Sequence, residues 1–203
     1  LNTNEFIVNI EKNNEVKILE IKNEAVVPNL DVEICGQNVA EKNEEIKYEF
    51  EIKNKSNTKL DNFTWTEYIP YEDSKVTKMV TGIYNEELDY EIYYKTNQND
   101  YRLFMNVNSL TSEYLSFDEL ALANKEVITE IKVEYKTVSK DFNAIIKPVI
   151  FTKIKNDVKK GDVIVNTTNL SGIIEEYTVR ESSSVETIIR EKEIIKKLPK
   201  TGC

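Results

Sequence analysis

Apolar and polar residues alternate along most of this chain with a period of two. The clearest stretch is EIKYEFEIKN at residues 45–54, where one face carries only apolar side chains, namely Ile46, Tyr48, Phe50 and Ile52. Successive side chains of a strand point to opposite faces of a sheet, so this pattern predicts a half-buried antiparallel strand.

The same alternation predicts further strands. One face gathers Leu88, Tyr90, Ile92 and Tyr94, and another gathers Val127, Thr129, Ile131, Val133 and Tyr135. The stretches YRLFMNVNSL, IIKPVIFTKI and DVIVNTT are also expected to be strands. Turns are expected at NKSNT, IPYEDS, TNQNDY, KKGD and NLSG, because Asn, Asp, Ser and Gly favour turns. SFDELALANKE fits one helical turn or a loop, and the loop is favoured.

These elements predict an all-β fold, a β-sandwich with Greek-key connections. A short N-terminal hairpin is expected around Asn13-Asn14, and AVVPN at 25–29 is interpreted as a linker. Alternation ends after about Arg190, which predicts an extended tail. The expected organisation is therefore residues 1–28, a complete domain at 29–190, and a tail at 191–203.

Composition narrows the classes of function. The 203 residues carry 27 basic and 36 acidic side chains, a net charge of −9, with no basic cluster. This argues against nucleic acid or anionic lipid as a partner, since phosphates are neutralised by clustered Lys and Arg. No histidine and no metal-ligand spacing occur, so neither a metal nor a cofactor is expected. No apolar run is long enough to span a membrane, and a first residue other than Met suggests a piece of a longer protein.

The residue types present also do not suggest a catalytic site. The acidic pairs Glu44-Glu45, Glu86-Glu87 and Glu175-Glu176 would suit a glycosidase only if both carboxylates faced one sugar bond. Neighbouring strand residues face opposite ways, so solvated edges and turns are expected instead. YEDS and NQND supply oxygen ligands without a calcium-loop spacing and are interpreted as turns. Cys35 is expected to be a small buried thiol, and no enzyme activity is expected.

The chain ends in KKLPKTGC, which holds the most specific motif. Pro199 favours an extended peptide and Gly202 permits close approach of a nucleophile. Leu198, Pro199, Lys200, Thr201 and Gly202 resemble the LPXTG signal that sortase transpeptidases of Gram-positive bacteria recognise. That resemblance implies cleavage between Thr201 and Gly202 and transfer of Thr201 to a peptidoglycan precursor or a pilin. The family's signal continues into an apolar span and a basic stop, so a truncated chain is expected; the alternative is a solvated tail without function.

Two further resemblances concern the rest of the chain. LNTNEFIVNIEKNNEVKILEIKNE is similar to the closing strands of a collagen-adhesin B-type (SpaA-type) domain, whose Asn, here Asn23, can form an isopeptide bond with an upstream lysine that this chain lacks. The alternative is an ordinary hairpin on the main domain.

EKNEEIKYEFEIKNKSNTKLDNFTWTEYIP resembles immunoglobulin-like repeats of bacterial surface proteins. These resemblances imply an immunoglobulin-like sandwich in a secreted, wall-anchored protein that acts as a stalk. The alternative is an adhesin that binds host matrix protein or glycan through Trp65 and tyrosine-rich faces; a buried Trp65 would count against it. A third option is an accessory module of a surface enzyme.

Overall fold

The computed structural model describes residues 4–12, 15–23 and 25–191, and side chains in the last range only. The described chain contains strands and no helix. The strands are β1 (Asn4–Lys12), β2 (Glu15–Asn23), β3 (Leu30–Cys35), β4 (Val39–Glu41), β5 (Glu45–Asn54), β6 (Leu60–Tyr68), β7 (Ser74–Val80), β8 (Ile83–Tyr84), β9 (Asp89–Thr96), β10 (Arg102–Asn108), β11 (Tyr114–Ser116), β12 (Ile128–Val138), β13 (Ala144–Ile146), β14 (Val149–Ile154), β15 (Val163–Ile174) and β16 (Tyr177–Arg190).

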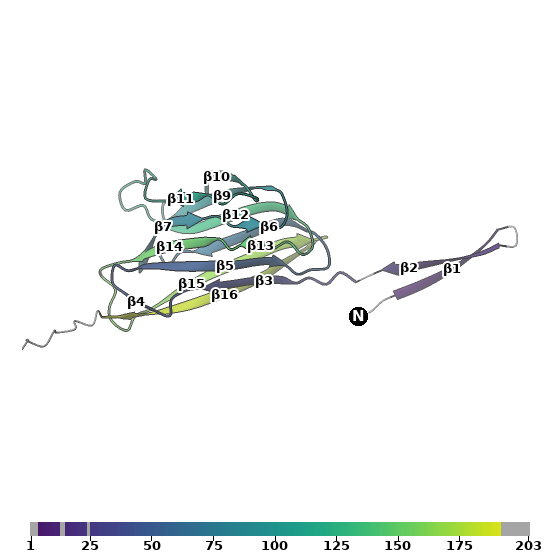
Figure 1. Ribbon diagram of the computed structural model, residues 1–203, viewed down its shortest axis with the longest axis horizontal. Coiled ribbons are helices and arrows are strands. Elements are labelled where there is room, and N and C mark those ends of the chain that lie inside the picture. Colours follow the sequence, from purple (N-terminus) through teal and green to yellow (C-terminus); the bar gives the residue numbers. More distant parts are fainter. Residues whose placement is uncertain (1–3, 13–14, 24, 192–203) are drawn as a thin grey trace, which may run out of the picture.

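Two sheets pack face to face, which confirms the predicted all-β sandwich (Figure 1). The seven-stranded sheet has the order β10-β9-β12-β6-β15-β16-β4, and the five-stranded sheet has the order β11-β7-β14-β5-β3. In each sheet a later strand lies between two earlier ones: β14 separates β5 from β7, and β12 separates β6 from β9. The small sheets β1-β2 and β13-β8 are antiparallel pairs.

The strand order matches the immunoglobulin arrangement, in which strands A, B, E and D form one sheet and C, F and G the other. Strands β3, β5, β14 and β7 take the first four places, and β6, β15 and β16 take the other three. The segment from β8 to β13 lies between the D and E positions in the chain and supplies β12, β9 and β10 as an extension of the second sheet. The chain switches sheets between β3 and β4, where β4 pairs in parallel with β16.

The apolar positions of the alternating pattern are the ones that the structure buries in the core. Ile46, Tyr48, Phe50 and Ile52 are all fully buried, and Tyr90, Ile92 and Tyr94 follow the predicted pattern. In β12 the prediction holds only from Ile131 onward. A register shift between Ile128 and Glu130 places Ile128 in the core and leaves the preceding Val127 only partly buried.

Two local predictions are wrong. NLSG at 169–172 is not a turn, because β15 continues to Ile174 with β16 on one side and β6 on the other. Pairing along both edges outweighs the turn preference of these four residues. Cys35 is exposed rather than buried, since the inward positions of β3 are Leu30, Val32 and Ile34.

The loop prediction for SFDELALANKE is confirmed, and one side chain organises it. Glu126 accepts hydrogen bonds from the Ala123 amide (2.8 Å), the Thr96 hydroxyl (2.8 Å) and the Asn99 amide group (2.9 Å), and it pairs with Arg102. The hydrogen bond from the Ala123 amide, followed by those from Thr96 and Asn99, lowers the pKa of Glu126 to about 2. An ionised Glu126 therefore ties this loop to the turn after β9.

The chain enters and leaves the sandwich at opposite ends (Figure 1). Residues 28–30 lie beside residues 179–181 near the start of β16, and the described domain ends at the far end of the same strand, where Arg190 pairs with Glu41. Ten residues of β-strand span about 33 Å. The predicted hairpin consists of β1 and β2, with Lys12 opposite Glu15, and its expected turn at Asn13-Asn14 lies outside the described residues.

Candidate functional site

The residues of the sorting motif, Leu198 to Gly202, and Cys203 lie outside the described part of the chain. The structure shows the strand that precedes them in the chain. This strand, β16, ends at Arg190, and seven residues separate Arg190 from Leu198. Asn23 is the last residue of β2 and pairs with Asn4, and its side chain is likewise outside the description.

The three acidic pairs lie at turns and strand ends. Glu44 accepts a hydrogen bond from the Glu41 amide (2.7 Å), and Glu86 accepts one from the Ser139 amide (2.9 Å), so both carboxylates hold loops. Glu175 and Glu176 are exposed in the turn between β15 and β16. No group of three or more His, Cys, Asp or Glu that would hold a metal ion occurs among the described residues.

Trp65 lies in the core and is 1% exposed. Its ring lies 4.7 Å from that of Phe50, and its indole N–H donates to the Thr168 hydroxyl across the β6–β15 pair (2.6 Å). A buried tryptophan on the C strand is a hallmark of immunoglobulin domains. Trp65 is therefore a packing residue, and the adhesin interpretation loses its principal candidate contact.

The most unusual site is a polar cluster between the two sheets, which sequence reasoning missed. Sheet pairing places Glu67 opposite Thr168 and diagonal to Asn166 on the inner face of the larger sheet. Tyr48 and Thr152 face inward from the smaller sheet. Glu67, Thr152 and Asn166 are fully buried. We name these five residues the core polar cluster.

The core polar cluster contains most of the unpaired buried polar atoms. Tyr48 Oη, Thr152 Oγ1, both carboxylate oxygens of Glu67 and both amide atoms of Asn166 have no hydrogen bond of good geometry within the described chain. Such atoms are rare in protein interiors and costly. Because these atoms are concentrated in the cluster, the cost of burying unpaired polar groups opposes the gain from packing mainly at this place in the core.

Burial dominates the electrostatics of this cluster. Burial raises the pKa of Glu67 well above its ordinary value, and the neighbouring Asn166 and Thr168 side chains offset only part of that effect. Burial also raises the pKa of the Tyr48 phenol; the Thr187 and Thr152 hydroxyls oppose this, whereas Glu67 adds to it. Burial therefore disfavours the charged form of Glu67 relative to the neutral form, and a neutral carboxyl group can donate a hydrogen bond as well as accept one.

The sequence did contain a signal for this site. From Phe63 onward the inward positions of β6 are Phe63, Trp65 and Glu67, so the period of two already places a carboxyl group in the core. In β15 the first three inward positions are Ile164, Asn166 and Thr168. A charged residue at an inward position is informative because it is almost never buried without a reason.

Because Gly36 has no Cβ atom, its backbone can pack closely against the ring of Tyr48. A Cβ atom at this position would lie 2.6 Å from Tyr48 Cδ1 and 2.7 Å from Cε1. We expect Gly36→Ala to lower the free energy of unfolding by about 1–3 kcal/mol, the usual cost of overpacking, measured by urea denaturation. The cost should shrink in a Tyr48→Leu background, which removes the ring; an equal cost in both backgrounds would contradict the contact.

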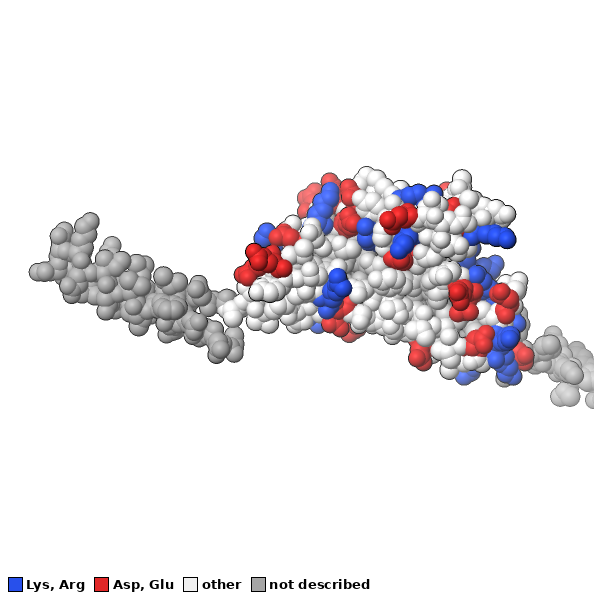
Figure 2. Space-filling view, turned by 180° about the vertical axis from the view of Figure 1, so that it is seen from behind, with Lys and Arg blue, Asp and Glu red and all other residues white. Residues whose placement is uncertain are grey.

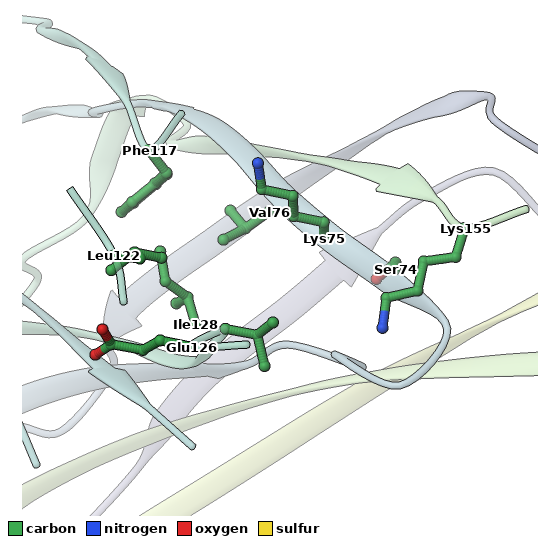
Figure 3. A pocket seen from close by; sticks show the side chains of 9 residues that line it. Ser74, Lys75, Val76, Phe117, Leu122, Glu126, Ile128 and Lys155 are labelled. Atoms are coloured by element: carbon green, nitrogen blue, oxygen red, sulfur yellow. The ribbon is translucent and has the colours of Figure 1, made fainter. Parts of the chain in front are cut away.

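A second site is an apolar pocket of about 90 Å³ between β7 and the 117–127 loop (Figure 3). Its apolar side chains come from Val76, Phe117, Leu122 and Ile128, and two lysines, Lys75 and Lys155, also line it. Pockets that hold drug-sized ligands have volumes of about 300–1,000 Å³, so this pocket is too small for a sugar chain or peptide.

Charges of both signs are interspersed on the face drawn in Figure 2. The face in Figure 2 carries no single-sign patch of the kind that binds a polyanion. Over the surface of the described chain as a whole, many charged side chains are paired, as in Lys78–Glu45 (2.6 Å), Lys95–Glu130 (2.8 Å) and Lys147–Glu51 (2.6 Å). No helix long and apolar enough to cross a membrane occurs in the described residues.

Comparisons with known proteins give no family for the chain. No family model and no curated protein match it. Among solved structures, the collagen-binding subdomain of the Enterococcus faecalis surface protein ACE aligns with a TM-score of 0.34 and 10% identity, covering 81% of this chain and 99% of that one. AvmM, which catalyses macrocyclization in alchivemycin A biosynthesis, aligns at 0.31 and 10% identity over 88% and 95%. A family 123 glycoside hydrolase from Clostridium perfringens aligns at 0.31 and 11% over 80% and 28%. These values are too low for any of the three proteins to bear on what this chain does.

Proposed function

We propose that this chain is a non-catalytic stalk module of a Gram-positive surface protein, and that sortase attaches it covalently to peptidoglycan or a pilus through the LPKTG peptide. The observation that carries the proposal is the axial path of the chain. It enters the sandwich beside residues 179–181 and leaves at Arg190, about 33 Å further along β16. A module inserted in this way adds its length to the distance between its neighbours.

The chemistry of the proposal belongs to the enzyme that acts on the chain. The cysteine thiolate of sortase would attack the carbonyl carbon of Thr201, and the Thr201–Gly202 bond would break to release a new amino terminus at Gly202. An amine of a wall precursor or a pilin lysine would then displace the cysteine and form an amide with Thr201. The sandwich would present upstream modules at the cell surface, and no step requires a catalytic residue of this chain.

A transpeptidation assay tests the attachment. We expect the full chain, incubated with a class A-type sortase and triglycine, to lose Gly202-Cys203 and gain the nucleophile at Thr201, as measured by intact-mass and tandem mass spectrometry. Thr201→Ala and Pro199→Ala are matched controls that should give no adduct, because each removes a fixed position of the motif. An unchanged mass for the unmutated chain would overturn the anchoring proposal.

A further inference from the structure

The chain enters the sandwich through β3 and leaves it through β16, and both strands are hydrogen-bonded along their length. β3 pairs with β5 from Leu30 opposite Asn54 to Cys35 opposite Glu49. The preceding residues 25–29 add further bonds to the β5–β6 loop. The Val27 amide donates to Asn57 Oδ1 (2.9 Å), and the Lys55 amide donates to the Asn29 carbonyl (2.9 Å). The segment interpreted as a linker is thus attached to the domain.

The last strand is held on both sides. β16 pairs with β15 over twelve residue pairs, from Val163 opposite Ile188 to Ile174 opposite Tyr177. On its other side its final three residues pair in parallel with β4. This parallel pair joins the N-terminal and C-terminal segments of the domain directly, because β4 follows β3 in the chain.

A side chain strengthens the parallel pair at the point where it begins. The hydroxyl of Thr187 donates to the Gln37 carbonyl (2.6 Å), and the next amide of β16, that of Ile188, donates to the Asn38 carbonyl (3.0 Å). Thr187, Ile189 and Ala40 are buried. Water therefore has little access to compete for these bonds.

Tension between the two ends would load these bonds in shear. The entering chain would pull β3 and β4 toward the start of β16, while the leaving chain would pull β16 the opposite way. Strands that slide past each other must break several hydrogen bonds together, whereas strands that peel apart break them one at a time. We propose that β4 and β16, with the Thr187–Gln37 bond, form a mechanical clamp that lets the sandwich carry tension along its axis. Its use in a cell rests on the proposed stalk function.

Single-molecule pulling on the full chain tests this clamp, in a Cys35→Ser, Cys203→Ser background. One attachment pair uses the two chain ends; the other uses the N-terminus and Glu175→Cys, in the turn before β16. The chain enters beside β16 residues 179–181, so the second pair pulls from the same end of the sandwich and peels strands. We expect the axial pull to need at least about twice the unfolding force. Equal forces in the two directions would overturn the proposal.

Thr187→Val tests the side chain, and Thr178→Val is its matched control, on the same strand but outside the β4 pairing. Loss of one hydrogen bond should raise the unfolding rate under axial load about fivefold. The same-end pull should change little, and Thr178→Val should change neither. A merely structural role for Thr187 would accelerate both pulls equally and would overturn the clamp. The unfolding forces and unfolding rates are measured without sortase. A failed transpeptidation assay would therefore overturn the anchoring proposal and leave the test of the clamp unaffected.

Discussion

Trp65→Ala is expected to lower the free energy of unfolding by about 3–5 kcal/mol, the usual cost of removing a large buried aromatic side chain. Trp65 is 1% exposed and packs on Phe50, so its loss leaves a cavity at the centre of the sandwich. The change also removes the indole donor from Thr168. Urea denaturation followed by circular dichroism measures the effect, since Trp65 is the one tryptophan of the chain.

Two controls separate packing from surface binding. Trp65→Phe keeps most of the volume and should cost less than half as much. Tyr68→Ala removes an aromatic side chain from the end of the same strand, where it is 43% exposed, and should change stability by less than about 1 kcal/mol. If Trp65→Ala left stability unchanged, Trp65 would be available to a ligand and the adhesin interpretation would regain its contact.

The predictions that succeeded depend on local geometry. The alternation over β5 identified the buried face, because an antiparallel strand with one wet side must repeat every two residues. The same rule would have placed Cys35 outside, since Leu30, Val32 and Ile34 already define the inner face of β3. Its burial was expected from the usual behaviour of cysteine, and strand parity overrides that tendency.

The predictions that failed depend on pairing between distant strands. NLSG continues β15 because Leu170 lies opposite Trp65 on one side and Glu181 on the other. The register shift near Ile128 arises where β12 meets β9. In both cases the partner strand lies outside the short stretch of sequence that carries the local pattern. The core polar cluster is similar, because Glu67 and Asn166 come together only through the β6–β15 pairing.

Glu67 gives the second large effect, because its pKa is raised in the folded chain. Between its unfolded value of about 4.5 and its folded value, the folded chain holds a proton that the unfolded chain releases. The unfolding free energy therefore falls as pH rises, by up to about 1.4 kcal/mol for each pH unit. The stabilising contribution is complete below the unfolded pKa and is lost as pH rises toward the folded one.

Glu67→Gln removes this titration while preserving shape. We expect the variant to match the unmutated chain near pH 4.5 and to become progressively more stable than it as pH rises above that value, because the fold no longer has to protonate a buried carboxylate. Urea denaturation at several pH values between 4.5 and 8 measures both slopes, and Glu126, with a pKa of about 2, stays ionised throughout. Glu186→Gln, an exposed change on β16, is the control and should leave the slope unaltered. Parallel curves for Glu67→Gln and the unmutated chain would mean that Glu67 is ionised in the core, where only a cation that the described cluster lacks would stabilise it.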